Sequence, residues 1–324
     1  MTLKNAQGSF YKEIILFLGP AASRLPPSRL EGWRLSLENG FGCPVSTFQG
    51  NESDFENRVE RRRDNQRLLL AVGGDGTINL ALNWIQDMGL IHTVLGTIPL
   101  GTGRDWVKSA GVPTDPDACV SWLPRQSPIP CDIGLAEWKK GSETHRGRFL
   151  NVTSLGISAD VDLYVQRARV RHPFLYLAAA LRSIVASQPL CVKVYLDDQL
   201  WFSGSTWILA AGNGRYFGGG MAVTPAARLD DGLLDVILVQ KVSRPNLLAS
   251  FHQIYLGSHI HRQDVQKGQA QKVFVECESG AMGVDLDGDA HLAETITLRV
   301  EPQAILVLAS PEGPGFQRQE KGEI

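Results

Sequence analysis

The stretch LLLAVGGDGTIN, residues 68–79, decides the fold of this chain. Its leading apolar residues predict a buried strand, and the two glycines that follow end that strand. Behind the glycines, apolar residues recur at helical spacing: Ile78, Ala81, Leu82 and Ile85. An amphipathic helix is therefore expected directly after the loop. A buried strand that passes through a glycine loop into a helix is the repeating unit of parallel α/β sheets.

Two more apolar runs flank this unit, at residues 14–18 and 94–98, and each ends at a glycine or a proline. They predict further strands of the same sheet. A proline-rich stretch at residues 124–130 then breaks the alternation of strands and helices. The pattern therefore favours a Rossmann-like α/β domain over residues 1–130.

Beyond residue 130 the pattern changes to short strand-like runs separated by turns. They lie at residues 149–152, 191–196, 207–210, 236–239, 272–275 and 305–308, with helical stretches near 161–187 and 246–255. Such a series predicts a mainly antiparallel second domain over residues 131–308, as in a sandwich or a barrel. The polar tail, residues 309–324, follows the second domain, and we expect it to pack back on the first domain.

Composition excludes several classes of protein. The 324 residues carry a formal net charge of -2, so no overall basic field exists to bind nucleic acid. Five cysteines without a CxxC pair fit a reducing cytosol, and they support neither a disulfide framework nor a zinc site. No run of 18 apolar residues occurs, and the polar N-terminus lacks a secretory signal. A cytoplasmic protein without a transmembrane segment is therefore expected.

The glycine loop at residues 73–77 suits a polyphosphate. Glycines let backbone N–H groups approach phosphate oxygens closely, and the start of a helix favours negative charge. Asp75 would repel phosphates, so it is expected to hold Mg²⁺ or to contact a hydroxyl group near the phosphates. The alternative is a tight strand-to-helix turn in which Asp75 serves only as a cap.

A second glycine loop, PLGTGRD at residues 99–105, also follows a predicted strand. Ligands of open α/β sheets bind at the carboxyl ends of the strands. Thr102 is placed to donate to a phosphate, and Asp105 is either a further carboxylate of the site or the N-cap of the next helix. An ordinary glycine turn is the alternative.

The second domain carries three further motifs. A glycine triplet at residues 218–220 gives up backbone entropy without side-chain packing, which favours close approach of the backbone to another group. The DDG sequence at 230–232 is, in isolation, typical of a hairpin turn. In an extended segment, Asp285, Asp287 and Asp289 would share one face, where their repulsion demands a metal ion, another cation or a proton-transfer role. The alternative is a solvated acidic turn.

Taken in order, five motifs resemble the catalytic-domain family of diacylglycerol kinases, especially its soluble bacterial lipid kinases. They are GGDGTIN at 73–79, PLGTGRD at 99–105, GNGRYFGGG at 212–220, PAARLDDGLLDV at 225–236 and DLDGD at 285–289. The resemblance covers about residues 14–308. It implies a first domain of the NAD-kinase and phosphofructokinase type, a β-sandwich second domain, and ATP in the cleft between the two domains.

The resemblance also implies a reaction and the residues for it. The γ-phosphoryl group of ATP would pass to a lipid hydroxyl group in a Mg²⁺-dependent reaction. The nucleotide contacts fall on Thr47, Gly73, Gly74, Asp75, Gly76, Thr77, Asn79 and Thr102. The magnesium ligands fall on the side chain of Asp231 and on the backbone carbonyls of Arg228 and Leu233.

The general base of the family, a glutamate, falls on Asp289, and Asp287 and Asp105 are the further catalytic candidates. Aspartate keeps the carboxylate but reaches less far by one methylene. Leu80 stands where the family usually has glutamate, and Arg104 stands where asparagine is usual. Arg104 compensates if its guanidinium pairs with a phosphate oxygen. Two alternatives follow from these departures and from the shared GGDG loop: a catalytically inactive protein that binds lipid or nucleotide, and an NAD-kinase-like enzyme.

A lipid substrate implies contact with a membrane surface. Basic residues in the segment 167–172 lead into the apolar segment 173–182. This combination suits peripheral contact with an anionic membrane or, alternatively, a core helix whose polar side is solvated. The interpretation leaves homodimer formation open, and the sequence does not name the lipid.

Overall fold

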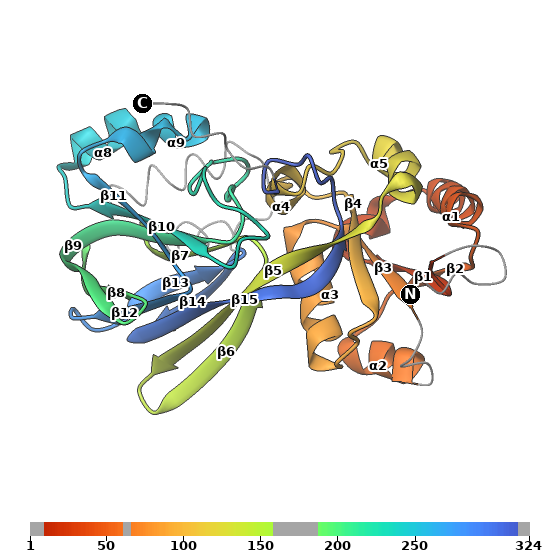
Figure 1. Ribbon diagram of the computed structural model, residues 1–324, viewed down its shortest axis with the longest axis horizontal. Coiled ribbons are helices and arrows are strands. Elements are labelled where there is room, and N and C mark those ends of the chain that lie inside the picture. The colour runs from red at the N-terminus through yellow and green to blue at the C-terminus, as the bar shows by residue number, and fades with distance from the viewer. Residues whose placement is uncertain (1–9, 61–65, 158–186, 317–324) are drawn as a thin grey trace. The chain divides into compact units, whose positions relative to one another are not determined.

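The computed structural model describes residues 10–60, 66–157 and 187–316 (Figure 1). The chain forms two compact units. The first unit runs to Cys131 and includes Ala304–Gly313, whereas the second comprises Asp132–Gln303 and the described residues from Pro314 onward. Residues 304–308, which the sequence interpretation assigned to the second domain, group with the first unit because they extend a strand that pairs with its sheet.

The first unit is built on a parallel sheet, as the sequence predicts. Its strands are β1 Glu13–Leu18, β2 Val45–Phe48, β3 Arg67–Gly73, β4 Thr93–Pro99 and the last residues of β15 Thr295–Leu308. The order is β15–β4–β3–β1–β2, and every pair is parallel. All residues of β3 and β4 are buried, as central strands covered on both faces require.

Helices connect these strands. They are η1 Pro20–Arg24, α1 Pro27–Phe41, α2 Glu52–Glu60, α3 Asp75–Asp87, α4 Asp105–Ser109, α5 Pro116–Trp122 and η2 Leu123–Arg125. The predicted apolar stripe of α3 is confirmed, because Ile78, Ala81, Leu82 and Ile85 are all buried. That stripe packs α3 against β3 and β4 (Figure 1).

The second unit is a sandwich-like pair of antiparallel layers. Its strands are β5 Pro128–Lys140, β6 Glu143–Phe149, β7 Val152–Gly156, β8 Leu190–Leu196, β9 Gln199–Gly212, β10 Leu234–Gln240, β11 Val265–Ala270, β12 Lys272–Cys277, β13 Met282–Leu286, β14 Asp289–Ala293 and the first part of β15. Residues 199–206 of β9 pair with β8, and residues 206–212 pair with β10 and in part with β7. The strand β9 therefore passes from one layer to the other.

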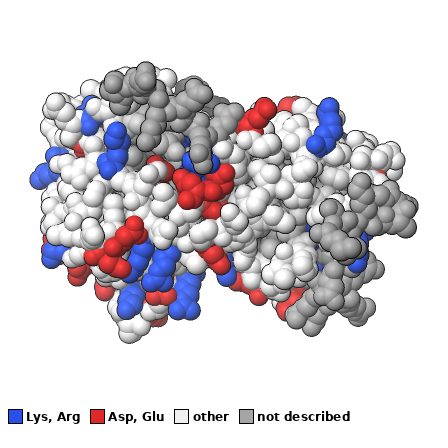
Figure 2. All heavy atoms as spheres, in the orientation of Figure 1, with Lys and Arg blue, Asp and Glu red and all other residues white. Residues whose placement is uncertain are grey.

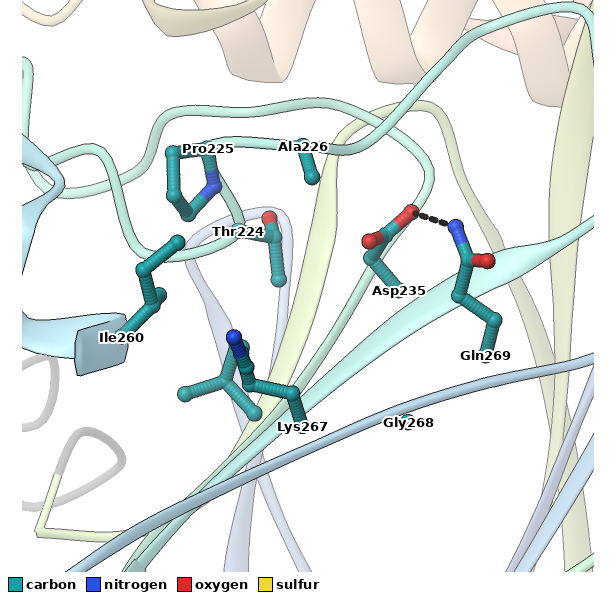
Figure 3. A pocket seen from close by; sticks show the side chains of 9 residues that line it. Thr224, Pro225, Ala226, Asp235, Ile260, Lys267, Gly268 and Gln269 are labelled. Carbon is teal, nitrogen blue, oxygen red and sulfur yellow. Dashed lines mark hydrogen bonds between the residues drawn. The ribbon is translucent and has the colours of Figure 1, made fainter. Parts of the chain in front are cut away.

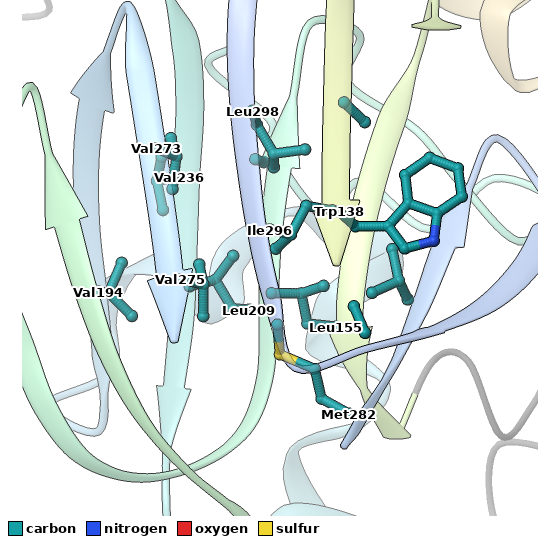
Figure 4. Close-up of a cluster of buried hydrophobic side chains, with 14 of the residues drawn as sticks. Trp138, Leu155, Val194, Leu209, Val236, Val273, Val275, Met282, Ile296 and Leu298 are labelled. Atoms are coloured by element: carbon teal, nitrogen blue, oxygen red, sulfur yellow. The ribbon is translucent and has the colours of Figure 1, made fainter. Parts of the chain in front are cut away.

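The core of this unit lies between its layers. One layer has the order β14–β13–β7–β9–β10–β11, and the other contains β8, β12, β15, β5 and β6. Buried side chains from both layers meet in a single apolar cluster (Figure 4), which includes Leu155, Val194, Leu209, Val236, Val275, Met282 and Leu298. The mainly antiparallel second domain that the sequence predicts is confirmed.

Short helices complete the second unit. They are α8 Arg244–Ser250, α9 Gln253–Leu256 and η3 Ser258–His261. The helix predicted near residues 246–255 is thus present in two pieces, and the one predicted near 161–187 lies outside the described residues except for its last residue. Among the described residues, no helix is both long and apolar enough to cross a membrane.

The strand predicted at residues 149–152 is wrong. The strand β6 ends at Phe149 and β7 begins at Val152, with a turn between them. The carboxylate of Asp287 accepts the backbone N–H groups of Leu150 at 2.7 Å, Asn151 at 3.1 Å and Val152 at 2.9 Å. An acceptor from a distant part of the chain therefore satisfies the backbone of this turn, which a continuous strand would have paired with a neighbour.

Candidate functional site

The two predicted glycine loops lie against each other in the first unit. The backbone N–H of Leu100 donates to the carbonyl of Gly73 at 2.8 Å, and that of Gly101 donates to the same oxygen at 3.3 Å. A Cβ atom on Gly101 would lie only 2.5 Å from the Cα of Gly74. Glycine is therefore required where the loop after β3 meets the loop after β4.

Asp75 joins the two loops through its carboxylate. Its Oδ1 accepts the backbone N–H of Trp106 at 3.2 Å, and its Oδ2 accepts that of Asp105 at 3.4 Å. Both donors belong to the first turn of α4. Burial raises the pKa of Asp75, although these two hydrogen bonds act in the opposite direction. Asp75 therefore does cap a helix through its side chain. The helix that it caps is α4, whereas Asp75 is itself the first residue of α3.

Asp105 is not the N-cap of α4. That position belongs to Arg104, which has a left-handed backbone with φ of 56°, and Asp105 is the first residue of the helix. The Nε of Arg104 donates to the carbonyl of Gly101 at 3.0 Å, which closes the loop on itself. Asp105 is buried, and a Cβ atom on Gly103 would lie 2.9 Å from Asp75 Oδ2 and 3.2 Å from Asp105 Oδ2. Two carboxylates therefore face the same glycine.

A third loop, at the end of β1, joins this edge of the sheet. The N–H of Gly19 donates to the carbonyl of Val72 at 3.0 Å. A Cβ atom on either Gly19 or Gly73 would collide with the side chain of Thr77, which is buried. The structure thus brings together residues 19, 73–77, 101–103 and 105 at the carboxyl ends of three adjacent parallel strands.

The remaining predicted nucleotide contacts lie around this junction. Asn79 is one turn along α3 and accepts the side-chain amide of Asn83 on its Oδ1 at 2.8 Å. Gly76 and Thr102 are exposed on their loops. Thr47 is an exposed residue of β2, and its backbone carbonyl accepts a hydrogen bond from Arg58 at 3.2 Å. Their contact with a nucleotide stays a prediction.

The junction has the chemistry of a phosphate site. The helix α3 begins directly after the glycines, so the positive end of its dipole and the N–H groups of its first turn lie at this loop. Asp75 and Asp105 bring negative charge to the same place, which disfavours a bare anion. A polyphosphate accompanied by a divalent cation resolves this conflict, because the cation attracts both groups.

The predicted metal ligands lie on an acidic loop of the second unit. Asp231 Oδ1 accepts the backbone N–H of Leu233 at 3.1 Å. The guanidinium of Arg228 contacts Asp230 at 2.7 Å and Asp231 at 3.9 Å. The loop belongs to the long connection between β9 and β10, so the hairpin-turn interpretation of residues 230–232 is wrong.

Asp132 holds this loop, and the sequence interpretation missed it. Its buried carboxylate accepts the backbone N–H of Gly232 and that of Gln303, each at 2.7 Å. Burial raises the pKa of Asp132, opposed by these hydrogen bonds, and the charge of Asp230 raises it further. The available signal was a single carboxylate inside the apolar run at residues 129–136.

A hard divalent cation fits the acidic loop. Burial raises the pKa of Asp231, and the negative charge of Asp132 raises it as well, so a cation would stabilise both ionised carboxylates. The expected set has one side chain and two backbone carbonyls, which are ligands that Mg²⁺ accepts. Within the described ranges, no group of three His, Cys, Asp or Glu side chains is arranged to hold a metal ion. A site with a single carboxylate ligand is compatible with that finding.

The glycine triplet forms a turn. Gly218, Gly219 and Gly220 all have positive φ, at 59°, 89° and 110°. Phe217 and Met221 on either side exchange two backbone hydrogen bonds of 3.0 Å. Three successive residues in a region that only glycine adopts easily give the triplet a backbone reason to be glycine, and its close approach to another group stays a prediction.

The three alternating aspartates do not share one face. Asp287 and Gly288 have positive φ of 50° and 92°, and they form the turn between β13 and β14. Asp285 is buried and accepts the N–H of Gly288 at 2.8 Å. Asp289 is exposed at the start of β14, with its Oδ2 3.3 Å from the Nε2 of His291. Of the three carboxylates, Asp289 therefore faces solvent.

A cavity of about 340 Å³ opens in the second unit (Figure 3). Its walls include Ile237 and Ile260, with Lys267 on β11. Asp235, on β10, accepts a hydrogen bond from Gln269 at 3.2 Å, and both residues line the cavity. Burial raises the pKa of Asp235 to about 6, opposed by this hydrogen bond. The cavity combines an apolar wall with a carboxyl whose pKa is raised toward neutral pH.

The surface carries a small basic group on the hairpin of β5 and β6. Figure 2 shows Lys and Arg side chains gathered at the place of this hairpin. Lys139, Lys140 and Arg146 are exposed there, and Arg146 pairs with Glu137 at 2.9 Å. The basic cluster predicted to contact a membrane, in residues 167–172, lies outside the described residues, so its role stays a prediction.

Two known families match the chain. Residues 35–136 match the family described as "Diacylglycerol kinase catalytic domain". Residues 151–309 match the one described as "YegS C-terminal NAD kinase beta sandwich-like domain". The first match contains both glycine loops, and the second contains the acidic loop and the β13–β14 turn.

Curated proteins and solved structures agree with these matches. The diacylglycerol kinase of Mycobacterium tuberculosis strain H37Rv is 30% identical over 247 residues, which cover 76% of this chain and 77% of the relative. A Pseudomonas putida protein named "Probable lipid kinase YegS-like" is 29% identical over 242 residues, or 73% of this chain and 75% of its own. A crystal structure of a diacylglycerol kinase from Bacillus anthracis strain Sterne has a TM-score of 0.68 at 18% identity, over 94% of this chain and 98% of that one. This last similarity shows the same fold.

Proposed function

Because this chain belongs to the diacylglycerol kinase catalytic-domain family, we propose that it is an ATP:lipid kinase that transfers the γ-phosphoryl group of ATP to a lipid hydroxyl group. The observation that carries the proposal is the meeting of the two glycine loops on Asp75. This junction of the two loops supplies backbone N–H donors that can bind phosphate oxygens. Its carboxylates lie beside these donors and require a cation when phosphate is bound. Phosphoryl transfer depends mainly on such positioning and charge neutralisation.

The first unit binds the nucleotide in this proposal. Backbone N–H groups at the start of α3 bind phosphate oxygens, and the side chain of Thr102 donates to a further oxygen. Asp75 keeps the two loops in register by holding the first turn of α4. Asp105, which faces the same glycine, adds a second carboxylate where the metal-bound phosphates lie.

The acidic loop of the second unit is the proposed magnesium site. The Asp231 side chain and the backbone carbonyls of Arg228 and Leu233 would hold Mg²⁺. The bound ion would neutralise phosphate charge and keep the loop ordered. Asp132 holds this loop in place before a metal ion binds, because its carboxylate accepts the backbone N–H of Gly232 at 2.7 Å.

Asp289 is the proposed general base. Its carboxylate accepts the proton of the lipid hydroxyl while that oxygen forms a bond to the γ-phosphorus and the bond to the ADP oxygen breaks. The exposure of Asp289 suits a base that must meet a substrate brought by a membrane surface. Asp287 is less suited to this role, since its carboxylate already accepts three backbone N–H groups.

The test offers radiolabelled ATP and Mg²⁺ with mixed micelles of diacylglycerol, sphingosine, ceramide or phosphatidylglycerol, and separately with NAD. Phosphorylated lipid is the expected product. An extract of total bacterial lipid, analysed by mass spectrometry after the reaction, identifies the acceptor if none of the pure lipids is labelled.

Other outcomes favour the alternatives. Transfer to NAD without transfer to lipid would support an NAD-kinase-like enzyme. Saturable ATP binding without transfer to any acceptor would support an inactive binding protein, to which the departures at Leu80, Arg104 and Asp289 point. Asp289→Asn serves as the matched control for contaminating kinases, since a contaminant is unaffected by this change.

A further inference from the structure

A histidine lies beside the exposed carboxylate of the β13–β14 turn. Asp289 and His291 are alternate residues of β14, so their side chains leave the strand on the same face. His291 Nε2 lies 3.3 Å from Asp289 Oδ2. The side chain of Asp289 is 77% exposed, whereas that of His291 is 28% exposed. A carboxylate that would rotate freely in solvent thus has a partly buried partner within contact distance.

The imidazole of His291 is itself held in place. Its centroid lies 4.6 Å from a ring centroid of Trp138, and the two planes meet at 40°. Trp138, on β5, is 6% exposed and packs in the core of the second unit (Figure 4). A ring that rests on a buried indole has already lost much of its rotational freedom, so a hydrogen bond from it costs little additional entropy.

We propose that His291 is a positioning residue for Asp289. In the tautomer that carries its proton on Nε2, the imidazole donates to Oδ2 of Asp289 and holds the carboxylate in one rotamer. The other oxygen, Oδ1, is then directed to accept the proton of the lipid hydroxyl. This inference rests on the proposed function, in which Asp289 is the base. It deepens that function by naming the residue that orients a short, exposed base, because orientation of a catalytic group contributes to the rate.

A purely structural role would also place His291 against Trp138, and His145 allows the two roles to be separated. The ring of His145, on β6, stacks on Trp138 with centroids 5.5 Å apart and planes at 24°. Its carboxylate neighbour is Glu143, at 3.4 Å. Phenylalanine at either histidine keeps a planar ring on the indole and removes the N–H donor. Only the change at His291 affects Asp289.

The kinetic test compares His291→Phe, His291→Gln and His145→Phe with the parent. His291→Phe should lower kcat roughly tenfold or more while leaving KM for ATP unchanged, since a misdirected base slows the chemical step without disturbing the nucleotide. His291→Gln retains an N–H donor and should recover much of the loss. His145→Phe should keep the kcat of the parent. In an Asp289→Asn background, His291→Phe should cause no further loss, because the two residues act as a unit.

The contact is tested independently of activity by the imidazole ¹⁵N resonances of His291, assigned by their absence from the His291→Phe spectrum. Asp289→Asn should shift these resonances at fixed pH. His145→Phe, as the control, should leave the resonances of His291 at their positions in the parent. Unshifted resonances in Asp289→Asn, or a fully active His291→Phe enzyme, would overturn the positioning role while the lipid kinase proposal stood. A parent enzyme without lipid kinase activity would overturn the proposed function, and this role of His291 with it.

Discussion

The carboxylate of Asp75 accepts the backbone N–H of Trp106 at 3.2 Å, across 31 positions of sequence. The loop after β3 therefore caps a helix that starts in the loop after β4. This side chain acts together with the backbone hydrogen bonds from Leu100 and Gly101 to Gly73 to hold both loops in one arrangement, and that arrangement is the proposed phosphate site. Loss of this carboxylate should accordingly affect activity far more than it affects the fold.

We expect Asp75→Ala to abolish lipid phosphorylation and to lower the free energy of unfolding by about 1 kcal/mol, the usual cost of losing a capping side chain. Asp115→Ala is the matched control, because Asp115 caps α5 by accepting the N–H of Ala118 at 2.8 Å. The control should lose similar stability and keep its activity. Urea unfolding and the radiolabel assay measure both quantities. Undiminished transfer in Asp75→Ala would remove this loop from the mechanism.

The local unit around Asp75 was predictable, since an apolar run, two glycines and a helical stripe are adjacent in sequence. The contacts that complete the sites were not. The carboxylate of Asp132 binds backbone N–H groups 100 and 171 positions away, at Gly232 and Gln303. No periodicity in the sequence encodes such a pair, because the folding of the whole second unit brings the partners together.

The acidic motif at residues 285–289 shows a different limit. Alternation of charge predicts one shared face only if the segment is extended. The glycine at position 288 was the available sign of a turn, and the positive φ of Asp287 and Gly288 reverses the chain there. The turn alternative was therefore the better interpretation of the backbone, although Asp285 in it is buried and not solvated.

The acidic loop should bind Mg²⁺ through Asp231. A ligand that binds only the folded state raises the melting temperature, so Mg²⁺ should stabilise the parent, and Asp231→Asn should reduce that stabilisation. Asp264→Asn is the control, because Asp264 likewise lies beside an arginine that precedes it in sequence, Arg262, at 2.9 Å. Differential scanning calorimetry of each protein with and without Mg²⁺ measures this shift in melting temperature. An Asp231→Asn protein with the same magnesium-induced shift as the parent would exclude this carboxylate as a ligand.

Asp235 should make stability depend on pH. Burial raises its pKa from 3.8 to about 6, opposed by the hydrogen bond from Gln269. Between these values the folded chain holds a proton that the unfolded chain has lost, so this group's contribution to the free energy of unfolding falls as the pH rises from about 4 to about 6. Above that range the ionised, buried carboxylate costs on the order of 3 kcal/mol.

Asp235→Asn should remove this cost, because asparagine stays neutral and its carbonyl oxygen can still accept from Gln269. The variant should be more stable than the parent at pH 7.5 by up to about 3 kcal/mol, and the difference should vanish near pH 4. Urea unfolding at several pH values tests this. Asp198→Asn, at a side chain that is 75% exposed, controls for loss of one surface charge. A constant difference between Asp235→Asn and the parent across this range would show that the carboxyl does not titrate as inferred.

Arg104 stands where the family usually has asparagine. Its role is either to shape the backbone of the loop or to contact a phosphate, and substitutions at this position distinguish the two. Its φ of 56° lies in the left-handed region, which asparagine adopts more readily than arginine. Its Nε also donates to Gly101 within the loop. If these local features define its role, Arg104→Asn should keep the stability of the parent within about 1 kcal/mol and leave KM for ATP unchanged, since the better backbone preference offsets the lost hydrogen bond.

Arg104→Ala separates the two roles, because alanine neither favours the left-handed region nor replaces the hydrogen bond. It should lower the free energy of unfolding by about 1–2 kcal/mol. If instead the guanidinium pairs with a phosphate, both variants lose that pair, and both should raise KM for ATP about tenfold or more while their stabilities still differ. The measured KM values therefore discriminate directly: a normal KM in Arg104→Asn assigns the residue to loop geometry, and a raised KM in both variants assigns it to the nucleotide.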